Sequence, residues 1–243
     1  MDTARTVLLV DCGSHPLQDL TARVRRVGFR VLRAKTPEDG REVLRESRHA
    51  VGALVLPSDF SAPDLGLALR AFRELSRDSS LPILVAGPRP AEEDGARLRS
   101  AGAELALFEP LDDHTLRFQL NRALCRRLDP RAERRAVRAP VDWAVRVRSG
   151  GREKPARVYC FSATGAFLAT SRPSSRGSLL YLTLPLPARS LDLAGRVVMT
   201  NVPGNLMHDN LPLGMAVQFT GVAPEAVAAL RCLAEDQSRA LEL

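Results

Sequence analysis

Five short apolar runs, each followed by a segment of helical spacing, constrain the first half of the chain most strongly. Residues 6–10 form the first run, and residues 16–27 then carry apolar side chains three or four positions apart. The alternation repeats in residues 30–34 and 36–47, 51–56 and 62–75, 82–86 and 90–101, and 105–108 and 112–124. Strands that alternate with helices in this way predict an α/β fold with a doubly wound, five-stranded parallel sheet.

Residues typical of helix boundaries agree with this periodicity. Thr36 followed by Pro37 indicates a helix start, with the threonine as the cap and the proline in the first turn. Gly28 and Gly102 stand where the preceding helices should end. The first half is therefore expected to fold as one domain.

After Leu128 the pattern changes to short segments of alternating character. The expected strands are residues 141–148, 156–161, 166–169, 178–184, 191–198 and 215–219. Clusters of Gly, Pro, Ser and Asn separate them, as is typical of turns. Six short strands at this spacing predict a small antiparallel β-barrel, which an amphipathic helix over residues 224–241 would close.

A formal net charge of +7 suits a partner that carries phosphate, acidic side chains or anionic lipid. Six arginines and two acids lie between residues 126 and 138, so this segment alone holds a charge of +4. Such an arginine strip is either a solvated linker or an arm that contacts a ligand. Nucleic-acid binding is disfavoured because no helix-turn-helix, zinc or aromatic-platform pattern accompanies the charge.

Several site classes find no support in the sequence. The four cysteines lie far apart without a CxxC pair, which argues against a zinc site and a disulfide framework. The four histidines are scattered, and no Gly-rich phosphate loop, GxSxG or HExxH is present, so an enzyme is not expected. The first apolar run is too short for a signal sequence or a membrane span, so we expect a cytoplasmic protein.

The first half resembles the receiver domain of response regulators over roughly residues 5–125. In that family, acids after the first strand hold Mg²⁺ and an aspartate at the end of the third strand takes a phosphoryl group. A Thr or Ser ends the fourth strand, and a Lys precedes a proline after the fifth. The corresponding positions here read Asp11-Cys12, Leu56-Pro57, Ala86-Gly87 and Glu109-Pro110.

Only Asp11 and Pro110 fit that receiver pattern. One aspartate is a poor Mg²⁺ site, and Glu109 reverses the charge that should face phosphate oxygens. Asp11 is then a cap or turn residue rather than a metal ligand, although Asp59 would become an acceptor if the third strand ended later. The resemblance implies an interaction module, with a partner or dimer surface around the fourth helix and the fifth strand.

The second half resembles PilZ domains in three segments that occur in the family's order. These are ERRAVRAPV at residues 133–141, RVYCFSATGAFL at residues 157–168 and GMAVQF at residues 214–219. The resemblance implies a site for cyclic di-GMP, with Arg134 and Arg138 as the motif arginines and Arg135 as an additional one. Guanidinium groups suit this ligand because they pair with guanine O6 and N7 and with phosphate.

Ser162 and Gly165 match the family's (D/N)xSxxG segment, but Cys160 stands where its Asp or Asn should be. A thiol is a weak hydrogen-bond partner, so the ligand would lose roughly 1.5–3 kcal/mol there. Ser162 and Gly165 could equally form a strand-end turn without a ligand, and Thr164 could crowd the site. Trp143 alternates with three valines, which favours a place in the barrel core over base stacking.

The predicted organisation is a receiver-like domain at residues 1–125, an arginine-rich linker at residues 126–133 and a PilZ domain at residues 134–243. Two functions stay open at this point. The chain could be a cyclic di-GMP effector that couples dinucleotide binding to protein contacts. It could also be a PilZ adaptor that has lost the ligand and acts through protein contacts only, for example in motility or polarity control.

Overall fold

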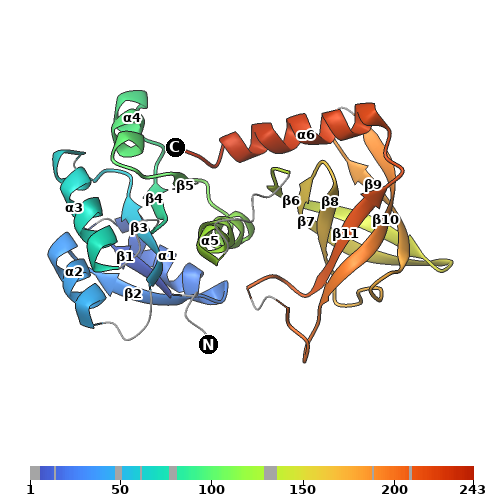
Figure 1. Ribbon diagram of the computed structural model, residues 1–243, viewed down its shortest axis with the longest axis horizontal. Helices are drawn as coiled ribbons and strands as arrows, with labels where there is room; N and C mark the ends of the chain where they lie inside the picture. The colour runs from blue at the N-terminus through green and yellow to red at the C-terminus, as the bar shows by residue number, and fades with distance from the viewer. Residues whose placement is uncertain are drawn as a thin grey trace. The chain divides into compact units, whose positions relative to one another are not determined.

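The computed structural model describes residues 6–13, 15–46, 51–60, 62–76, 81–128, 136–187, 189–207 and 210–243 (Figure 1). The chain divides into two compact units. The first consists of Met1–Glu133 together with Leu241–Leu243, and the second of Arg134–Ala240. Each unit has its own core and is described by itself.

The first unit confirms the predicted parallel, doubly wound sheet. Its elements are β1 (Thr6–Val10), α1 (His15–Arg26), β2 (Arg30–Ala34), α2 (Pro37–Glu46), β3 (Val51–Pro57), α3 (Ala62–Leu75), β4 (Ile83–Gly87), α4 (Glu92–Ser100), β5 (Leu105–Phe108) and α5 (Asp113–Leu128). The strands are parallel and lie in the order β2-β1-β3-β4-β5. In such sheets ligands bind where the strand order reverses, which here is between β1 and β3.

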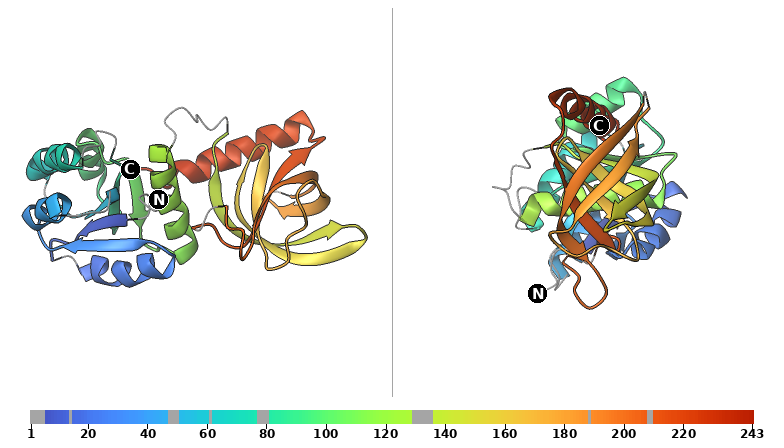
Figure 2. Two further views of the ribbon diagram at one scale, coloured as in Figure 1. Left: turned by 60° about the horizontal axis from the view of Figure 1, so that its bottom comes forward. Right: turned by 90° about the vertical axis from the view of Figure 1, so that its right-hand side faces the viewer.

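Helices cover both faces of this sheet, as Figures 1 and 2 show. The core on one face joins α1 and α5 to the strands, through residues such as Leu20 and Leu120. The core on the other face joins α2, α3 and α4, with Phe72 of α3 fully buried in it. Burial on both faces explains why β1, β3 and β4 are continuous apolar runs instead of alternating ones.

The helix boundaries follow the predicted signals with one extension. The Thr36 hydroxyl accepts a hydrogen bond from the Asp39 amide at 3.2 Å, as expected of a cap. Gly28 and Gly102 both have a φ of +95°, the left-handed conformation that favours glycine after a helix. Helix α5, predicted to end at residue 124, continues to Leu128. Arginine is a good helix former, and no helix breaker occurs before Pro130.

The second unit confirms the predicted six-stranded antiparallel barrel. Its strands are β6 (Ala139–Ser149), β7 (Arg152–Ser162), β8 (Gly165–Ala169), β9 (Leu179–Pro185), β10 (Ser190–Asn201) and β11 (Gly214–Thr220). They close in the order β10-β11-β8-β7-β6-β9, with antiparallel neighbours throughout. Strands β6, β7 and β10 are longer than predicted, because their polar and proline-containing ends pair with neighbours that the alternation pattern did not reveal.

One face of each barrel strand points into a single core, which α6 (Pro224–Arg239) covers with Leu230 and Ala234. Trp143 packs against this core, with its ring centroid 5.1 Å from that of the buried Phe161. The core assignment of Trp143 is therefore confirmed. Figures 1 and 2 both show α6 lying along the barrel.

The predicted end of the closing helix was wrong. Helix α6 ends at Arg239 instead of residue 241. Residues 241–243 leave the helix and belong to the first unit, where the Leu241 carbonyl accepts a hydrogen bond from the Ala106 amide of β5 at 3.0 Å. A backbone partner on an edge strand satisfies polar groups that the last turn of a helix leaves unpaired. The sequence of an amphipathic helix does not reveal such a partner.

Candidate functional site

The strand-order reversal of the first unit holds the one acid that matches the receiver pattern, Asp11. Its carboxylate lies 2.6 Å from the Arg33 guanidinium of β2 and accepts a hydrogen bond from the Gly13 amide at 3.1 Å. Burial raises the pKa of Asp11, but the Gly13 amide and the Arg33 guanidinium outweigh it, so the pKa falls below its ordinary value of 3.8. The acid is therefore an ionised turn residue with a cationic partner.

The other receiver positions lie at or just beyond the ends of β3, β4 and β5, without the expected chemistry. Strand β3 ends at Pro57, so the later strand end that could have brought Asp59 into the acceptor position is not present. Asp59 lies exposed in the turn beyond it. Strand β4 ends at Gly87, and the Glu109–Pro110 peptide bond that follows β5 is cis.

A hollow of about 520 Å³ opens beside this edge of the sheet. Cys12, Glu38, Arg41 and Asp59 contribute its polar lining, and Arg41 is already paired with Glu38 at 2.7 Å. Burial, together with Asp11, Asp59 and Glu38, raises the pKa of the Cys12 thiol. Among the residues that the structure describes, no three His, Cys, Asp or Glu side chains are arranged to hold a metal ion.

In the barrel, strand pairing brings the two PilZ-like motifs together. Ala139 of β6 lies opposite Phe161 of β7, so the preceding residue, Arg138, is level with Ser162. Arg138 is exposed. Arg134 and Arg135 fall outside the described ranges. The residue that follows the arginine motif is thus paired with the strand that leads into the β7–β8 hairpin.

Cys160 is buried, with 4% of its surface exposed. It lies in β7 opposite Phe167 of β8, next to an irregularity in the pairing of these strands. Its neighbour Tyr159 is equally buried and meets the Phe167 ring edge-on at 6.0 Å. Cys160 thus stands among buried aromatic residues, where a ligand's polar edge would have to give up its water to reach a weak partner.

Ser162 is used by the hairpin itself. Its hydroxyl accepts from the Thr164 amide at 3.3 Å and donates to the Gly165 carbonyl at 3.3 Å, and only 3% of the residue is exposed. The Thr164 carbonyl in turn accepts from the Phe219 amide of β11 at 2.9 Å. These bonds describe a strand-end turn of the kind that serine side chains stabilise.

Gly165 is required by the approach of β11. A Cβ atom at this position would collide with the Val217 carbonyl oxygen. The backbone that approaches this glycine is therefore a strand of the barrel itself.

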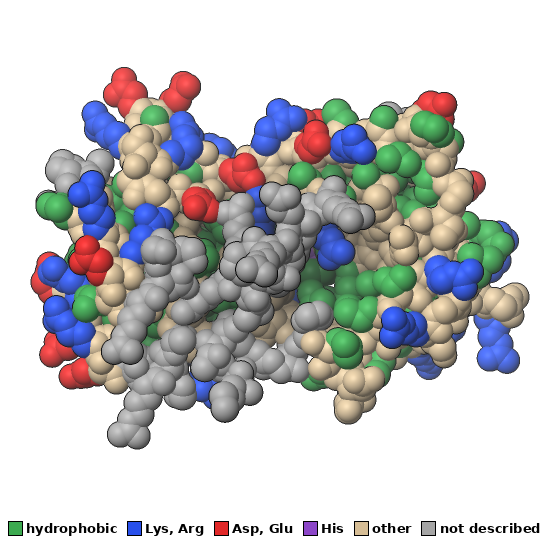
Figure 3. Space-filling model, viewed as in Figure 1, with side chains coloured by type: hydrophobic (Ala, Val, Ile, Leu, Met, Phe, Trp, Pro, Cys, Tyr) green, Lys and Arg blue, Asp and Glu red, His purple; other side chains and the backbone are tan. Residues whose placement is uncertain are grey.

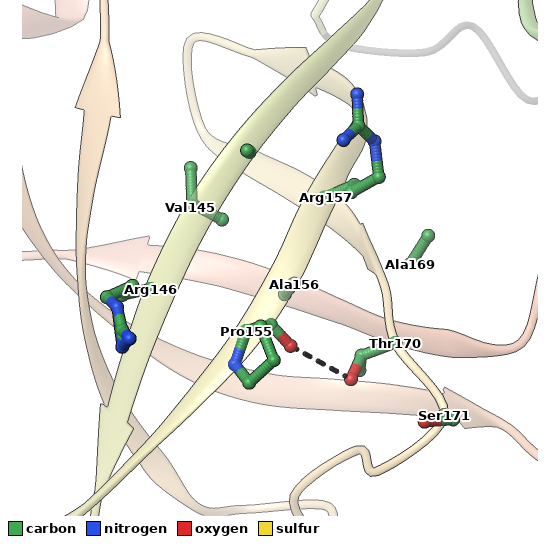
Figure 4. Close-up of a pocket in the computed structure, with 9 residues that line it drawn as sticks. Val145, Arg146, Pro155, Ala156, Arg157, Ala169, Thr170 and Ser171 are labelled. Carbon is green, nitrogen blue, oxygen red and sulfur yellow. Dashed lines mark hydrogen bonds between the residues drawn. The ribbon is translucent and has the colours of Figure 1, made fainter.

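One hollow in the barrel surface lies elsewhere on β6, β7 and β8 and measures about 480 Å³, and another of about 670 Å³ lies between β6, β9 and β10. Arg146, Arg157, Thr170 and Ser171 supply the polar groups of the first, none of which the sequence had singled out. Figure 4 shows the two guanidinium groups pointing away from each other, while the Thr170 hydroxyl donates to the Pro155 carbonyl at 3.3 Å. Arg157 is also paired with Asp142, so this hollow presents no convergent anion site.

Basic side chains on the visible face of the barrel are spread over several places, as Figure 3 shows. Tyr181 is half exposed and lies under the Arg148 guanidinium, 5.8 Å from ring centroid to the guanidinium carbon. The alternation of exposed arginines along β6 was the sequence signal that could have drawn attention to this surface.

No helix in the described part of the chain is long and apolar enough to cross a membrane.

Comparisons with known proteins divide the chain in the same way. Residues 132–236 match the family described as PilZ domain. Protein PilH of Pseudomonas aeruginosa is 28% identical over 121 residues, which cover 49% of this chain and 96% of that protein.

Three solved structures illustrate the structural similarities. The chemotaxis protein CheY4 of Vibrio cholerae covers 49% of this chain and 98% of its own, with 20% identity and a TM-score of 0.42. A response regulator of Chloroflexus aurantiacus covers 50% and 98%, with 22% identity and a TM-score of 0.44. The Bacillus subtilis inhibitor of motility covers 44% and 52%, with 20% identity and a TM-score of 0.37.

Residues 132–236, which include the closed barrel, thus match the PilZ domain, and the N-terminal half is a doubly wound sheet of parallel strands in the order β2-β1-β3-β4-β5.

Proposed function

We propose that this chain is a signalling adaptor that acts through protein contacts, without phosphoryl transfer in its receiver-like half and without a requirement for cyclic di-GMP in its PilZ domain. The observation that carries the proposal is the pairing of Asp11 with Arg33 and the Gly13 amide. A receiver needs this acid to attract a divalent cation. Here a guanidinium neutralises it within the protein, and Pro57 stands where the acceptor carboxylate would be.

Burial of the barrel motif supports the second part of the proposal. Cys160 and Ser162 are both nearly inaccessible to solvent. The Ser162 hydroxyl already forms hydrogen bonds with the Thr164 amide and the Gly165 carbonyl of the hairpin. A ligand that relied on them would have to displace existing hydrogen bonds. The serine of the motif thus stabilises the turn between β7 and β8.

Phosphoryl transfer is tested by incubating the chain with Mg²⁺ and acetyl phosphate and measuring its intact mass. We expect no added phosphoryl group. Asp59→Asn serves as the control variant, because Asp59 is the nearest exposed carboxylate beyond β3. A phosphoryl adduct on the wild type that disappears in Asp59→Asn would overturn the adaptor proposal for the first unit.

The second candidate is a cyclic di-GMP effector, and one observation favours it. The β6–β7 register pairs Ala139, the residue after the exposed Arg138, with Phe161, which supports a site shared by the two motifs. An arginine arm at residues 134–138 could then close over a ligand, with the planar guanidinium groups gripping guanine and phosphate.

Calorimetric titration separates the two candidates. At ligand concentrations on the order of 100 μM, where weak specific binding is detectable, we expect no saturable heat from the wild type. Saturable binding that Arg138→Ala abolishes would establish the effector instead. Cys160→Asp and the size-matched Cys160→Ser should be titrated beside it, with thermal unfolding to verify the fold. Binding gained only in Cys160→Asp would assign the loss of ligand to the cysteine.

A further inference from the structure

The outer edge of β5, the last strand of the first sheet, is partly covered by residues 241–243 of the same chain. Strand β5 is the last strand in the sheet order, and Glu242 forms an antiparallel bridge with its Leu105. The Ala106 amide donates to the Leu241 carbonyl at 3.0 Å. Figure 1 shows the end of the chain beside β5. An exposed strand edge is a template for pairing with another segment, and here residues 241–243 cover part of it.

Side chains of α5 add a recognition element to this edge. The Gln119 amide group is fully buried and donates both to the Ala106 carbonyl at 2.9 Å and to the Leu241 carbonyl at 2.6 Å. Arg122, whose side chain is 16% exposed, forms an ion pair with Glu242. Leu243 packs on the opposite side of the strand, against the core that contains Leu98 and Phe108. The edge thus contacts an acid followed by an apolar residue.

The site has more hydrogen-bonding capacity than residues 241–243 use. Gln119 Oε1 and the Arg122 Nη1 are buried and make no hydrogen bond in the structure. Strand β5 spans Leu105–Phe108, whereas the tail forms its bridge at Leu105 only. Because amides alternate in direction along a strand, the Phe108 amide faces the same edge as that of Ala106. A longer extended segment would have further groups to pair with.

We propose that the β5 edge, with Gln119 and Arg122, is a docking site where a partner protein adds an extended segment that carries an acid followed by a leucine-like residue. Main-chain pairing with β5 gives affinity, and the Arg122 and Leu243 subsites give specificity, as in other cases of strand addition. Residues 241–243 are an internal stand-in that such a partner displaces. This proposal specifies the kind of partner for the adaptor function above, but its test requires neither phosphate nor cyclic di-GMP.

The test uses a fluorescent peptide with the sequence of residues 236–243 and measures its binding by anisotropy. The receptor is a variant that ends at Ala240, whose fold is verified by circular dichroism. We expect saturable binding to this variant. For the full chain, binding should be roughly tenfold weaker, because the tethered tail competes at an effective concentration on the order of millimolar. A peptide with Glu242→Lys should bind at least about tenfold more weakly, the effect of losing one charge-assisted contact.

Matched variants of the protein locate the site. Arg122→Gln should weaken peptide binding about tenfold, whereas Arg97→Gln, which removes an exposed arginine of α4 from its i,i+3 pair, should leave binding unchanged. If the variant ending at Ala240 does not fold, full-length Glu242→Lys replaces it, because it releases the tail without shortening the chain.

Three results would overturn the proposal. The first is the absence of saturable binding to a folded receptor with a released tail, and the second is binding that Arg122→Gln does not weaken. The third is a wild-type chain that forms a dimer by exchanging residues 241–243, since this would assign the edge to a second copy. Sedimentation of the wild type and of Glu242→Lys distinguishes that outcome. Failure of the adaptor proposal would be recognised separately, by phosphoryl incorporation or ligand heat.

Discussion

The two units differ in what has become of the residues that define their families. In the receiver-like unit most of them are replaced, and the remaining Asp11 is paired with Arg33. In the barrel, Ser162 and Gly165 are present, and both have structural roles in the β7–β8 hairpin. Receiver residues sit at strand ends that the sheet does not need, so they can change without loss of fold. The barrel's motif residues are held by packing, so they can persist without a ligand.

The comparison warns against inferring chemistry from a retained motif. Gly165 is explained by the Val217 carbonyl oxygen that approaches it, whatever the ligand. Cys160, the one motif position that departs from the family, is a buried residue for which the barrel accepts a small apolar side chain. Four experiments test which of these residues have structural roles and which have functional ones.

Phe161→Ala should cost the barrel about 3–5 kcal/mol, because it empties a fully buried site that Trp143 packs against. Trp143 is the single tryptophan, so urea unfolding followed by its fluorescence reports the barrel directly. Phe72→Ala, an equally buried change in the first unit, is the matched control. A Phe72→Ala variant that moved the Trp143 transition as far as Phe161→Ala would mean that the units unfold together.

Gly165→Ala should destabilise the barrel by about 3 kcal/mol, because β11 cannot recede from the new methyl group without losing its pairing with β8. The same fluorescence transition measures it. Gly66→Ala is the control, since Gly66 lies in α3 with open space around its Cβ position and should gain up to about 1 kcal/mol. If Gly165→Ala left the free energy of unfolding unchanged, packing against β11 would not explain this glycine, and a role in ligand contact would be favoured.

Asp11→Asn should cost the first unit roughly 1.5–3 kcal/mol at neutral pH, the range for hydrogen bonds to a charged group. Because the folded-state pKa of Asp11 is lowered, its stabilisation is present above the unfolded-state value of about 3.9 and is lost as pH falls through the folded-state value. Urea unfolding followed by helical circular dichroism should therefore show the two proteins converging at acid pH. Asp94→Asn, an exposed acid of α4, should change stability by less than about 0.5 kcal/mol. Equal changes in stability for both substitutions would show that the Asp11–Arg33 pair stabilises the unit no more than an exposed ion pair does.

Burial and the nearby acids raise the pKa of the Cys12 thiol above its ordinary value of 9.0. At a pH about one unit below that value, Cys12 should therefore react slowly with iodoacetamide, because the thiolate is the reactive form. Asp59→Asn removes one of those charges and should accelerate alkylation by about twofold, a typical result for a partly screened charge. Peptide mass spectrometry measures it, with the exposed Cys232 in the same sample as an internal reference. An unchanged rate of Cys12 alkylation would show that the charge of Asp59 does not affect the thiol.

Sequence reasoning located most elements because their signals are local. The bounds of β1, β2, α3 and β5 were predicted to the residue, since apolar runs and helical spacing mark them. The errors lie at element ends, where a distant partner decides the outcome. The last residues of the predicted closing helix pair with β5, more than a hundred positions earlier in the chain, and no local pattern encodes that contact.

The candidate site was predictable in part. Strand pairing brings Ala139, the residue after Arg138, opposite Phe161 of β7. The ligand roles of Arg134, Arg135, Arg138, Cys160, Ser162 and Gly165 stay predictions. Arg33, the partner of Asp11, was not anticipated, because it stands 22 positions away and carries no motif of its own.

The spacing of apolar residues was enough to predict the two architectures, because it is a property of short segments. The cationic partner of Asp11, the burial of Cys160 and the place of residues 241–243 on the edge of the first sheet became visible only in the folded chain. Each of these depends on groups that folding brings together from distant positions, where burial and charge act through space rather than along the chain.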